Sequence, residues 1–243
     1  MIYNPKSEVS FSKLLKNDSK FNIIYLLFYT SIAFHIAKLC KKLEIVTPGY
    51  ITFSGMGSKI LNFIDAGGML KITKLIFKEI LGDDNIEIVK SKIEPKVITS
   101  KGGVYFVEEN ESKQEDESIR KILLGDKELN IISNDEKKYT YNDIDDEVIE
   151  SIADEFITFL ALIGQIERYL DFKEYFGFTK NDYLKYIETL GKRTKVIEYI
   201  KHGIAAKHRQ LNGDFNQRIE EPLFFYPLIG GLNKLAYMIS NEN

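Results

Sequence analysis

The sequence has very little of several features that usually define a class of protein. It contains one cysteine, Cys40, among 243 residues, so an internal disulfide bond is impossible and a reducing cytoplasm is the natural setting. Its formal net charge of −3 gives no electrostatic reason to expect nucleic acid as a partner. The opening residues, MIYNPKSEVSFSK, lack the apolar run and the small-residue cleavage site of a signal peptide. We therefore expect a cytoplasmic protein that does not bind nucleic acid.

Familiar catalytic and nucleotide-binding motifs are missing as well. Gly57-Ser58-Lys59 does not have the residue order of a P-loop, and Ile60 stands where a dinucleotide fingerprint requires its third glycine. Ser54 and Ser58 have no evident base partner, which leaves nucleophilic catalysis without support. The sequence therefore identifies no catalytic residue and no metal site.

What the sequence does contain is helical periodicity, joined by a few short strand signals. The chain is long enough for one large domain or two small ones. The acidic stretch over residues 108–117, EENESKQEDE, has no apolar residue and is expected to be a solvated loop. Strands are predicted over residues 50–53, 86–89, 120–124 and 128–132. Helices are predicted over residues 20–43, 69–81, 142–169, 179–190, 192–211 and 220–240, the last one kinked or broken at Pro227 and Gly230-Gly231.

The helix predicted over residues 20–43 is apolar on almost every side, which is typical of a buried helix or of a membrane span. Polar residues interrupt it at Asn22, Thr30, Ser31, His35 and Lys38, so a membrane span is the less favoured alternative. No second histidine or acidic cluster stands near His35 in the sequence, and this histidine is expected to be a core residue rather than a metal ligand.

The most informative stretch is YITFSGMGSKILNFI, residues 50–64. A β-rich run enters a turn that contains Gly55 and Gly57, and an apolar-periodic helix follows until Ala66-Gly67-Gly68 breaks it. A strand that stops at glycines and continues as a helix can present its backbone N–H groups to a phosphate or a nucleotide. A plain strand-to-helix turn, with glycines chosen for positive φ, is the simpler alternative.

This order of elements resembles the adenosine-binding segment of the ATPase superfamily that includes actin, the sugar kinases and the heat-shock chaperones. In that superfamily a strand, a glycine turn and a helix are followed by a second helix, a short strand and a proline-containing approach to a second glycine turn. Here EPKVITSKGGVYF, residues 94–106, resembles the last part, and the helix over residues 20–43 occupies the place of the preceding helix. The resemblance covers roughly residues 20–107.

The resemblance implies a fold and a ligand. The implied fold is α/β and mainly helical, with the small sheet of an actin-like, ribonuclease H-like half-domain in residues 1–107. A small β element and a helical C-terminal region would then occupy residues 119–243. The implied ligand is ATP or ADP, and Gly102 and Gly103 would support the binding turn by close packing. The implied nucleotide-binding residues are Gly55, Met56, Gly57, Ser58 and Lys59.

The chain departs from the superfamily in one respect that bears on catalysis. The superfamily uses two earlier Asp-x-Gly phosphate hairpins, and Asp65-Ala66-Gly67 has these letters at the end of a predicted helix instead. We therefore expect an adenosine-side portion that is not catalytic as an isolated chain. Its partner would be a missing lobe or a larger parent protein, and magnesium would bind only with that lobe present.

Two alternatives of other classes stay open. One is a non-catalytic interaction or assembly module that docks a partner through the apolar block from Leu223 to Met238. The other is a membrane-associated protein anchored by residues 20–43. The basic region over residues 192–209 is expected to be a solvated helix face, and Glu220-Glu221 is expected to open a helix at Pro222.

Overall fold

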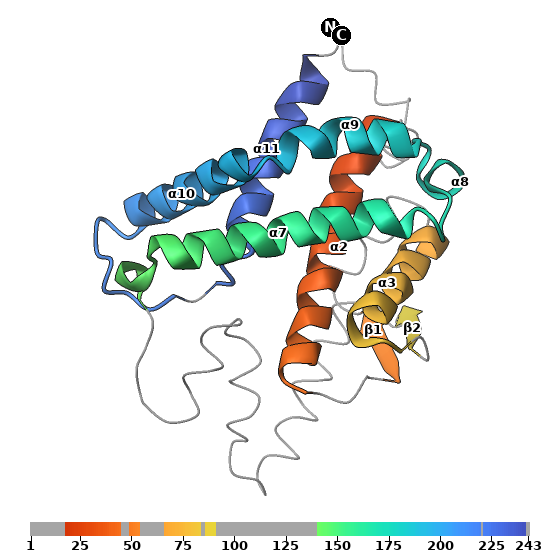
Figure 1. Cartoon of the computed structure of the whole chain (residues 1–243), viewed down its shortest axis with the longest axis horizontal. Helices are drawn as coiled ribbons and strands as arrows, with labels where there is room; N and C mark the ends of the chain where they lie inside the picture. Colours follow the sequence, from red (N-terminus) through yellow and green to blue (C-terminus); the bar gives the residue numbers. More distant parts are fainter. Residues whose placement is uncertain are drawn as a thin grey trace, which may run out of the picture.

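The computed structural model of the protein describes residues 18–44, 49–53, 66–83, 86–90, 140–219 and 221–241. This described part is mostly helical (Figure 1). In chain order its elements are α2 (Ser19–Lys42), β1 (Tyr50–Phe53), α3 (Ala66–Leu81), β2 (Glu87–Lys90), the 3-10 helix η2 (Tyr141–Asp143), α7 (Asp146–Ile166), α8 (Phe172–Phe176), α9 (Lys180–Leu190), α10 (Arg193–Gln210) and α11 (Phe225–Ser240).

Helix α2 is the element on which several others pack. The Asp18 carboxylate caps its start by accepting the backbone N–H groups of Lys20 and Phe21 at 2.9 and 3.0 Å. Helices α3, α7 and α11 all contact α2, and α7 crosses it in Figure 1. Leu26 and Ala37, eleven positions apart along α2, are both fully buried. The helix predicted over residues 20–43 is confirmed to within one residue at each end.

Among the described residues, α2 is the one helix that is long and apolar enough to cross a membrane. The match rests on length and composition, which a core helix also satisfies, and 61% of the most apolar window is buried inside the protein. His35 lies in this buried surface, with its ring stacked 5.6 Å from Phe224 and edge-on to Phe225 at 5.3 Å. The core position expected for His35 is confirmed.

A cluster of aromatic rings lies where α2, α7 and the start of α11 meet. Four phenylalanine rings form an aromatic centre there: Phe34 from α2, Phe156 and Phe159 from α7, and Phe224 just before α11. The Phe224 ring lies 5.5 Å from Phe34, 6.1 Å from Phe156 and 5.8 Å from Phe159, centroid to centroid. Such tilted and edge-on pairs add to the free energy gained by burial. Through Phe224, the apolar block near the C-terminal end thus packs on α7.

Helices α10 and α11 pack closely because each presents a glycine to a tyrosine of the other. A Cβ at Gly230 would lie 2.6 Å from Cβ of Tyr199, and a Cβ at Gly203 would lie 3.0 Å from Cβ of Tyr226. Helix α11 therefore uses Gly230 for packing and continues unbroken from Phe225 to Ser240, so of the predicted kink or break the break is wrong. Pro227 causes no break because it lies in the first turn, where the missing N–H would have no partner within the helix.

A second aromatic group, called the α8 corner, consists of Phe172, Phe176, Phe178 and Tyr183 and packs α8 against α9. The ring of Phe172 lies within 5.7 Å of the rings of Phe176, Phe178 and Tyr183. The side-chain amide of Asn22 in α2 donates a buried hydrogen bond of 2.9 Å to the carbonyl of Phe176. Helix α8 was not predicted, because its five residues are too few to show a helical period.

Strands β1 and β2 form a parallel pair with α3 between them in sequence. The register runs from Tyr50 opposite Glu87 to Phe53 opposite Lys90. Within the described residues, strand is limited to these two four-residue segments and one isolated bridge, between Thr140 and Arg218. Helices supply nearly all of the packing instead.

The predicted α/β fold with an actin-like sheet half-domain is therefore not supported, and the described part of the protein is mostly helical. A half-domain of that kind needs several paired strands, whereas the described core consists of helix-on-helix contacts. The strands predicted over residues 120–132 and the domain boundary predicted between residues 107 and 119 lie outside the described residues. Helix α3 also begins at Ala66, three residues earlier than predicted.

Candidate functional site

The five residues predicted to bind nucleotide, residues 55–59, lie outside the described part of the structure, as do Gly102 and Gly103. The structure does describe the elements on either side. Strand β1 ends at Phe53, directly before the glycine segment, and α3 begins at Ala66 after it. In the sequence, residues 55–59 therefore stand between a strand and a helix.

The parallel pairing of β1 and β2 defines an edge from which two candidate segments leave. Because the strands are parallel and Phe53 is opposite Lys90, both carboxyl ends lie at the same edge. Residues 54–59 follow the end of β1, and residues 91–103 follow the end of β2. Ligands of parallel sheets bind outside the carboxyl ends of the strands. We call this place the strand edge.

Helix α3, which connects the two strands, is fixed firmly to α2. Its residues Ile72, Ile76 and Phe77 are buried. The Tyr29 hydroxyl of α2 lies 2.8 Å from the Thr73 hydroxyl of α3 in a buried hydrogen bond, and burial raises the pKa of Tyr29 to about 12. The side of α3 that faces α2 is thus part of the core, and the lysines of α3 lie on its remaining surface.

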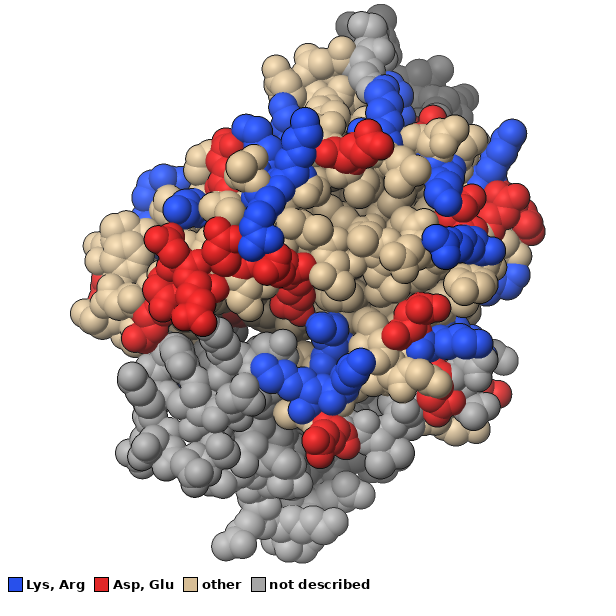
Figure 2. All heavy atoms as spheres, viewed as in Figure 1, with Lys and Arg blue, Asp and Glu red and all other residues tan. Residues whose placement is uncertain are grey.

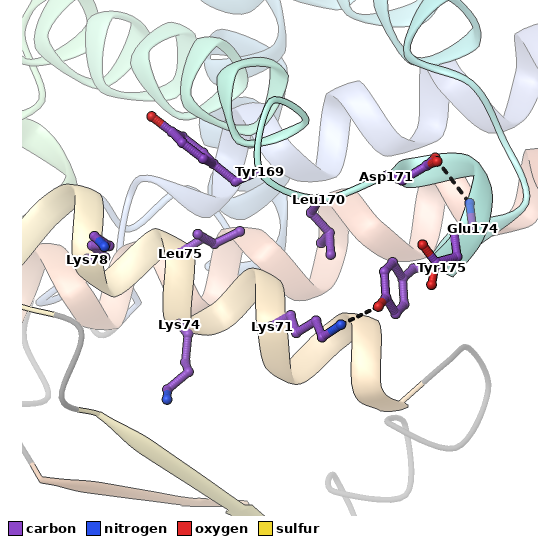
Figure 3. A pocket seen from close by; sticks show the side chains of 9 residues that line it. All are labelled: Lys71, Lys74, Leu75, Lys78, Tyr169, Leu170, Asp171, Glu174 and Tyr175. Carbon is purple, nitrogen blue, oxygen red and sulfur yellow. Dashed lines mark hydrogen bonds between the residues drawn. The ribbon is translucent and has the colours of Figure 1, made fainter.

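Those lysines line a groove of about 490 Å³ between α3 and the region of α8 (Figure 3). Positions 71, 74 and 78 are three and four residues apart, so they share one face of the helix. The groove, called the lysine groove below, is lined by Lys71, Lys74, Leu75 and Lys78 from α3 and by Tyr169, Leu170, Asp171, Glu174 and Tyr175 from the opposite wall.

The opposite wall carries two carboxylates and two tyrosines. Asp171 caps α8, and its Oδ1 accepts the N–H groups of Lys173 and Glu174 at 2.8 and 3.2 Å. Lys71 Nζ donates to the Tyr175 hydroxyl and lies 4.3 Å from the centre of that ring. Tyr169 is 67% exposed. The groove thus offers ammonium groups on one side and carboxylates with an accessible aromatic ring on the other.

A polar cluster at the other end of the molecule surrounds Glu221. Its Oε1 accepts hydrogen bonds from the hydroxyls of Tyr141 at 2.9 Å and Tyr226 at 2.8 Å, and its Oε2 accepts from Lys207 at 3.0 Å. Burial by itself would raise the pKa of Glu221, but these three donors outweigh it and lower the pKa. The carboxylate is held as an ion by three donors, which ties η2, α10 and the chain before α11 together.

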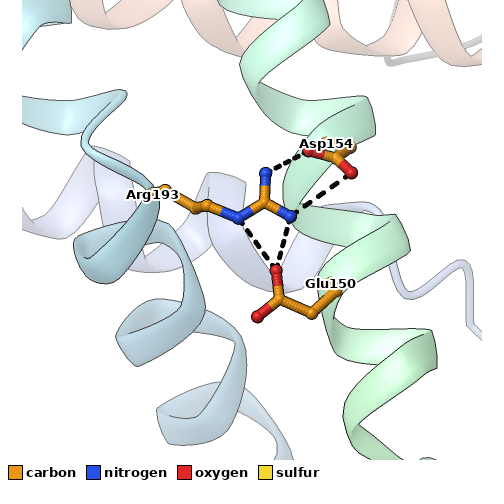
Figure 4. Close-up of polar contacts among 3 residues, drawn as sticks. All are labelled: Glu150, Asp154 and Arg193. Atoms are coloured by element: carbon orange, nitrogen blue, oxygen red, sulfur yellow. Dashed lines mark hydrogen bonds and ion pairs between the residues drawn. The ribbon is translucent and has the colours of Figure 1, made fainter.

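Several basic side chains of α10 form ion pairs with acidic side chains of the same chain. Arg193 bridges Glu150 and Asp154 of α7, with Nε donating to Glu150 at 2.9 Å (Figure 4). Lys195 pairs with Glu198, and Lys201 lies 3.5 Å from Asp146. Acidic side chains gather over the start of α7, and basic ones cover α10 beside it (Figure 2). The expectation of a solvated helix face agrees with this arrangement.

Sequence reasoning missed the lysine groove and misplaced Glu221. Helix α3 was interpreted from its apolar positions, although the 71, 74, 78 spacing of its lysines could have indicated a cationic face. Glu221 was expected to open a helix at Pro222, but α11 begins at Phe225 and Glu221 binds Tyr141, eighty positions away in the chain. Such a long-range pair leaves no local signal. Among the described residues, no group of three or more His, Cys, Asp or Glu side chains is arranged to hold a metal ion.

Comparison of the chain with protein-family models, with curated proteins and with solved structures finds no match. The resemblance to the actin and heat-shock-chaperone superfamily therefore stays a prediction. It is carried by the order of elements between residues 20 and 107 and by the two glycine segments.

Proposed function

We propose that this chain binds an adenine nucleotide, ATP or ADP, at the strand edge, as the adenosine-side part of a larger ATPase in the cytoplasm. The observation that carries the proposal is the parallel pairing of β1 with β2. It brings Phe53 and Lys90, the last strand residues before the two glycine-containing segments of the sequence, to one edge, and parallel sheets bind their ligands at such an edge. The proposal needs only this strand pair and the helix between, not a complete sheet half-domain.

The chemistry of the glycine segment suits adenosine and ribose better than phosphate transfer. Backbone atoms of Gly55 and Gly57 would approach the ligand closely, since glycine has no Cβ to occupy the space. Met56, Ser58 and Lys59 would complete the contact surface. Phosphoryl transfer also needs preorganised charge around the phosphates and magnesium. We assign that part to a missing lobe, and the isolated chain is expected to show no turnover.

Calorimetric titration of the full chain with ADP and with adenosine tests the proposal. We expect a dissociation constant near the millimolar range, equivalent to about 4 kcal/mol, because only one side of the ligand is contacted. Affinity should depend on the adenosine moiety and change little with magnesium. Magnesium-dependent hydrolysis of ATP by the chain alone would contradict the assignment of catalysis to another lobe.

A pair of glycine variants locates the site. Gly57→Val should abolish binding, because a branched side chain fills the ligand space and resists positive φ. Gly49→Val is the matched control: Gly49 precedes β1, and an added Cβ there meets nothing within 4 Å. ADP binding that survives Gly57→Val, or that is lost equally in both variants, would rule out the strand edge as the site.

The predicted partner surface from Leu223 to Met238 is a weaker second candidate. Phe224, Leu228 and Leu235 of this block are buried in the protein's own core. Ile229 and Tyr237 are exposed, at 57% and 63%. A partner would therefore meet only this outer face, and the docking of a partner there stays a prediction.

A further inference from the structure

We propose that the lysine groove binds a short peptide segment of a partner protein, one that presents acidic side chains to α3 and a basic side chain to the opposite wall. This site is separate from the strand edge and does not depend on nucleotide binding. The groove's three lysines, two carboxylates and two tyrosines carry the inference.

The wall formed by α3 selects for acidic side chains. Lys71 and Lys78 are seven residues apart, which places them roughly 10 Å apart along the helix axis. Lys74 lies between them along the axis, at the rim of the groove, and its extended side chain points away from the opposite wall in Figure 3. A row of this length matches a few consecutive residues of a peptide rather than a single small anion. Opposite charges across an interface give specificity and speed association.

The opposite wall argues against a nucleic acid or another polyanion. Asp171 and Glu174 line the same groove as the lysines. Asp171 is engaged as the cap of α8 and keeps its negative charge in place. A polyanion that reached the lysines would be repelled by these carboxylates, whereas a peptide of mixed charge satisfies both walls.

The tyrosines and leucines provide the apolar contact that a peptide interface needs. Tyr169 is 67% exposed, and Leu75 and Leu170 line the groove between the charged walls. Tyrosine is enriched among the residues that contribute most to protein–protein affinity, because a large, stiff ring is buried at little entropic cost. A volume of about 490 Å³ accommodates a few side chains.

The groove is also preorganised, because both walls are fixed to the core. A Cβ at Gly68 of α3 would lie 2.7 Å from Cβ of Tyr175, so α3 and α8 are in close contact below the groove. The hydrogen bond from Asn22 to the carbonyl of Phe176 holds α8 on α2. Rigid walls lower the entropic cost of binding.

A random dodecapeptide phage library, selected on the full chain, tests the proposal. Wild-type protein should enrich peptides that combine acidic residues with at least one lysine or arginine. Lys74→Glu should not enrich them, whereas the matched charge change Lys201→Glu, on α10, should. A synthetic peptide from the enriched pool, measured by fluorescence anisotropy, should lose at least tenfold in affinity with Lys74→Glu and less than twofold with Lys201→Glu.

Two further measurements separate lost recognition from a folding defect, and peptide binding from binding of a nucleic acid. Lys74→Gln removes the charge without reversing it and should weaken the peptide severalfold at an unchanged melting temperature, so a folding defect is distinguished from lost recognition. Oligodeoxythymidine should not displace the peptide. The proposal is overturned if nothing is enriched, if the enriched peptides lack acidic residues, if Lys74→Glu and Lys201→Glu bind equally, or if oligodeoxythymidine binds more tightly than the peptide.

Discussion

The aromatic centre is a buried cluster of side chains, whereas the unit formed by β1, α3 and β2 carries accessible charged surface. In the aromatic centre, Phe34, Phe156, Phe159 and Phe224 come from three distant parts of the chain and are at most 3% exposed. The β1–α3–β2 unit has two four-residue strands, a helix with three lysines on one face, and an open groove. Tight interior packing specifies the fold, while an accessible charged surface is available to ligands.

This contrast predicts that different residues determine folding stability and ligand binding. Substitutions in the aromatic centre should change folding stability, and substitutions at the strand edge or in the lysine groove should change binding at nearly constant stability. Substitutions in helix α3 can affect either property, because its buried face holds Ile72, Ile76 and Phe77 in the core while its lysines line the groove.

The largest effect is expected for Phe224→Ala. The Phe224 ring contacts those of Phe34, Phe156 and Phe159, so its removal leaves a cavity that these neighbours cannot fill. We expect a loss of about 3–5 kcal/mol in the free energy of unfolding, measured by denaturant titration. Tyr169→Ala, at an exposed ring of the lysine groove, should change it by less than about 0.5 kcal/mol. Equal losses in the two variants would contradict the comparison.

A smaller effect is expected where α10 and α11 cross. Gly230→Ala places a methyl group 2.6 Å from Cβ of Tyr199 and should cost about 1–3 kcal/mol through overpacking. Gly164→Ala in α7 is the matched control, because the nearest atom to its Cβ is 3.8 Å away. That variant should be neutral or stabilised by up to about 1 kcal/mol. Removing the opposing ring with Tyr199→Ala should reduce the cost of Gly230→Ala. If the two substitutions instead changed the free energy of unfolding additively, the close contact would be contradicted.

The cluster around Glu221 should make stability depend on pH. Because its folded-state pKa is lowered from the ordinary value of 4.5, its contribution is present above that value and is lost as pH falls through the folded pKa. Glu221→Gln should therefore reduce stability at neutral pH by about 1–2 kcal/mol. The difference from wild type should close in acid. Denaturation of both proteins across this range checks the sign, and a difference independent of pH would refute it.

The smallest effect is expected for the bridge from Arg193 to Glu150 and Asp154. Hydrogen bonding to Arg193 lowers the pKa of Asp154, but all three side chains lie on the surface. Water and salt screen such pairs. Arg193→Ala should lower the melting temperature slightly at low ionic strength and leave it unchanged in high salt. A large loss that persists in salt would mean that the bridge organises α7 and α10.

Local patterns in the sequence predicted the helices well and the sheet poorly. Apolar periodicity placed α2, α9 and α10 to within a residue or two at each end, because their buried faces repeat every turn. The actin-like sheet failed because strand signals of four residues do not say how many partners a strand has. The predictions at two glycines were also wrong. Gly68 and Gly230 were interpreted as positions where a helix breaks, but both lie within helices and allow close packing against a tyrosine.

The candidate sites differ in what the sequence could reveal. The glycine segment at residues 54–59 was visible because its residues are consecutive. The lysine groove needed the structure, because Lys74 and Tyr169 are far apart in sequence and meet only when α8 folds against α3. Its cationic half was present in the spacing of the lysines, and its acidic half was not predictable without the packing of the α8 corner.

Hydrogen exchange of the full chain, with and without ADP near its expected millimolar dissociation constant, tests the central claim most directly. If nucleotide binds at the strand edge, protection should increase in peptides that cover β1 and residues 54–65, because ligand contact suppresses local opening. Peptides from α7, α9, α10 and α11 should exchange as before. Unchanged exchange throughout, or new protection centred on α9 to α11, would contradict nucleotide binding at the strand edge.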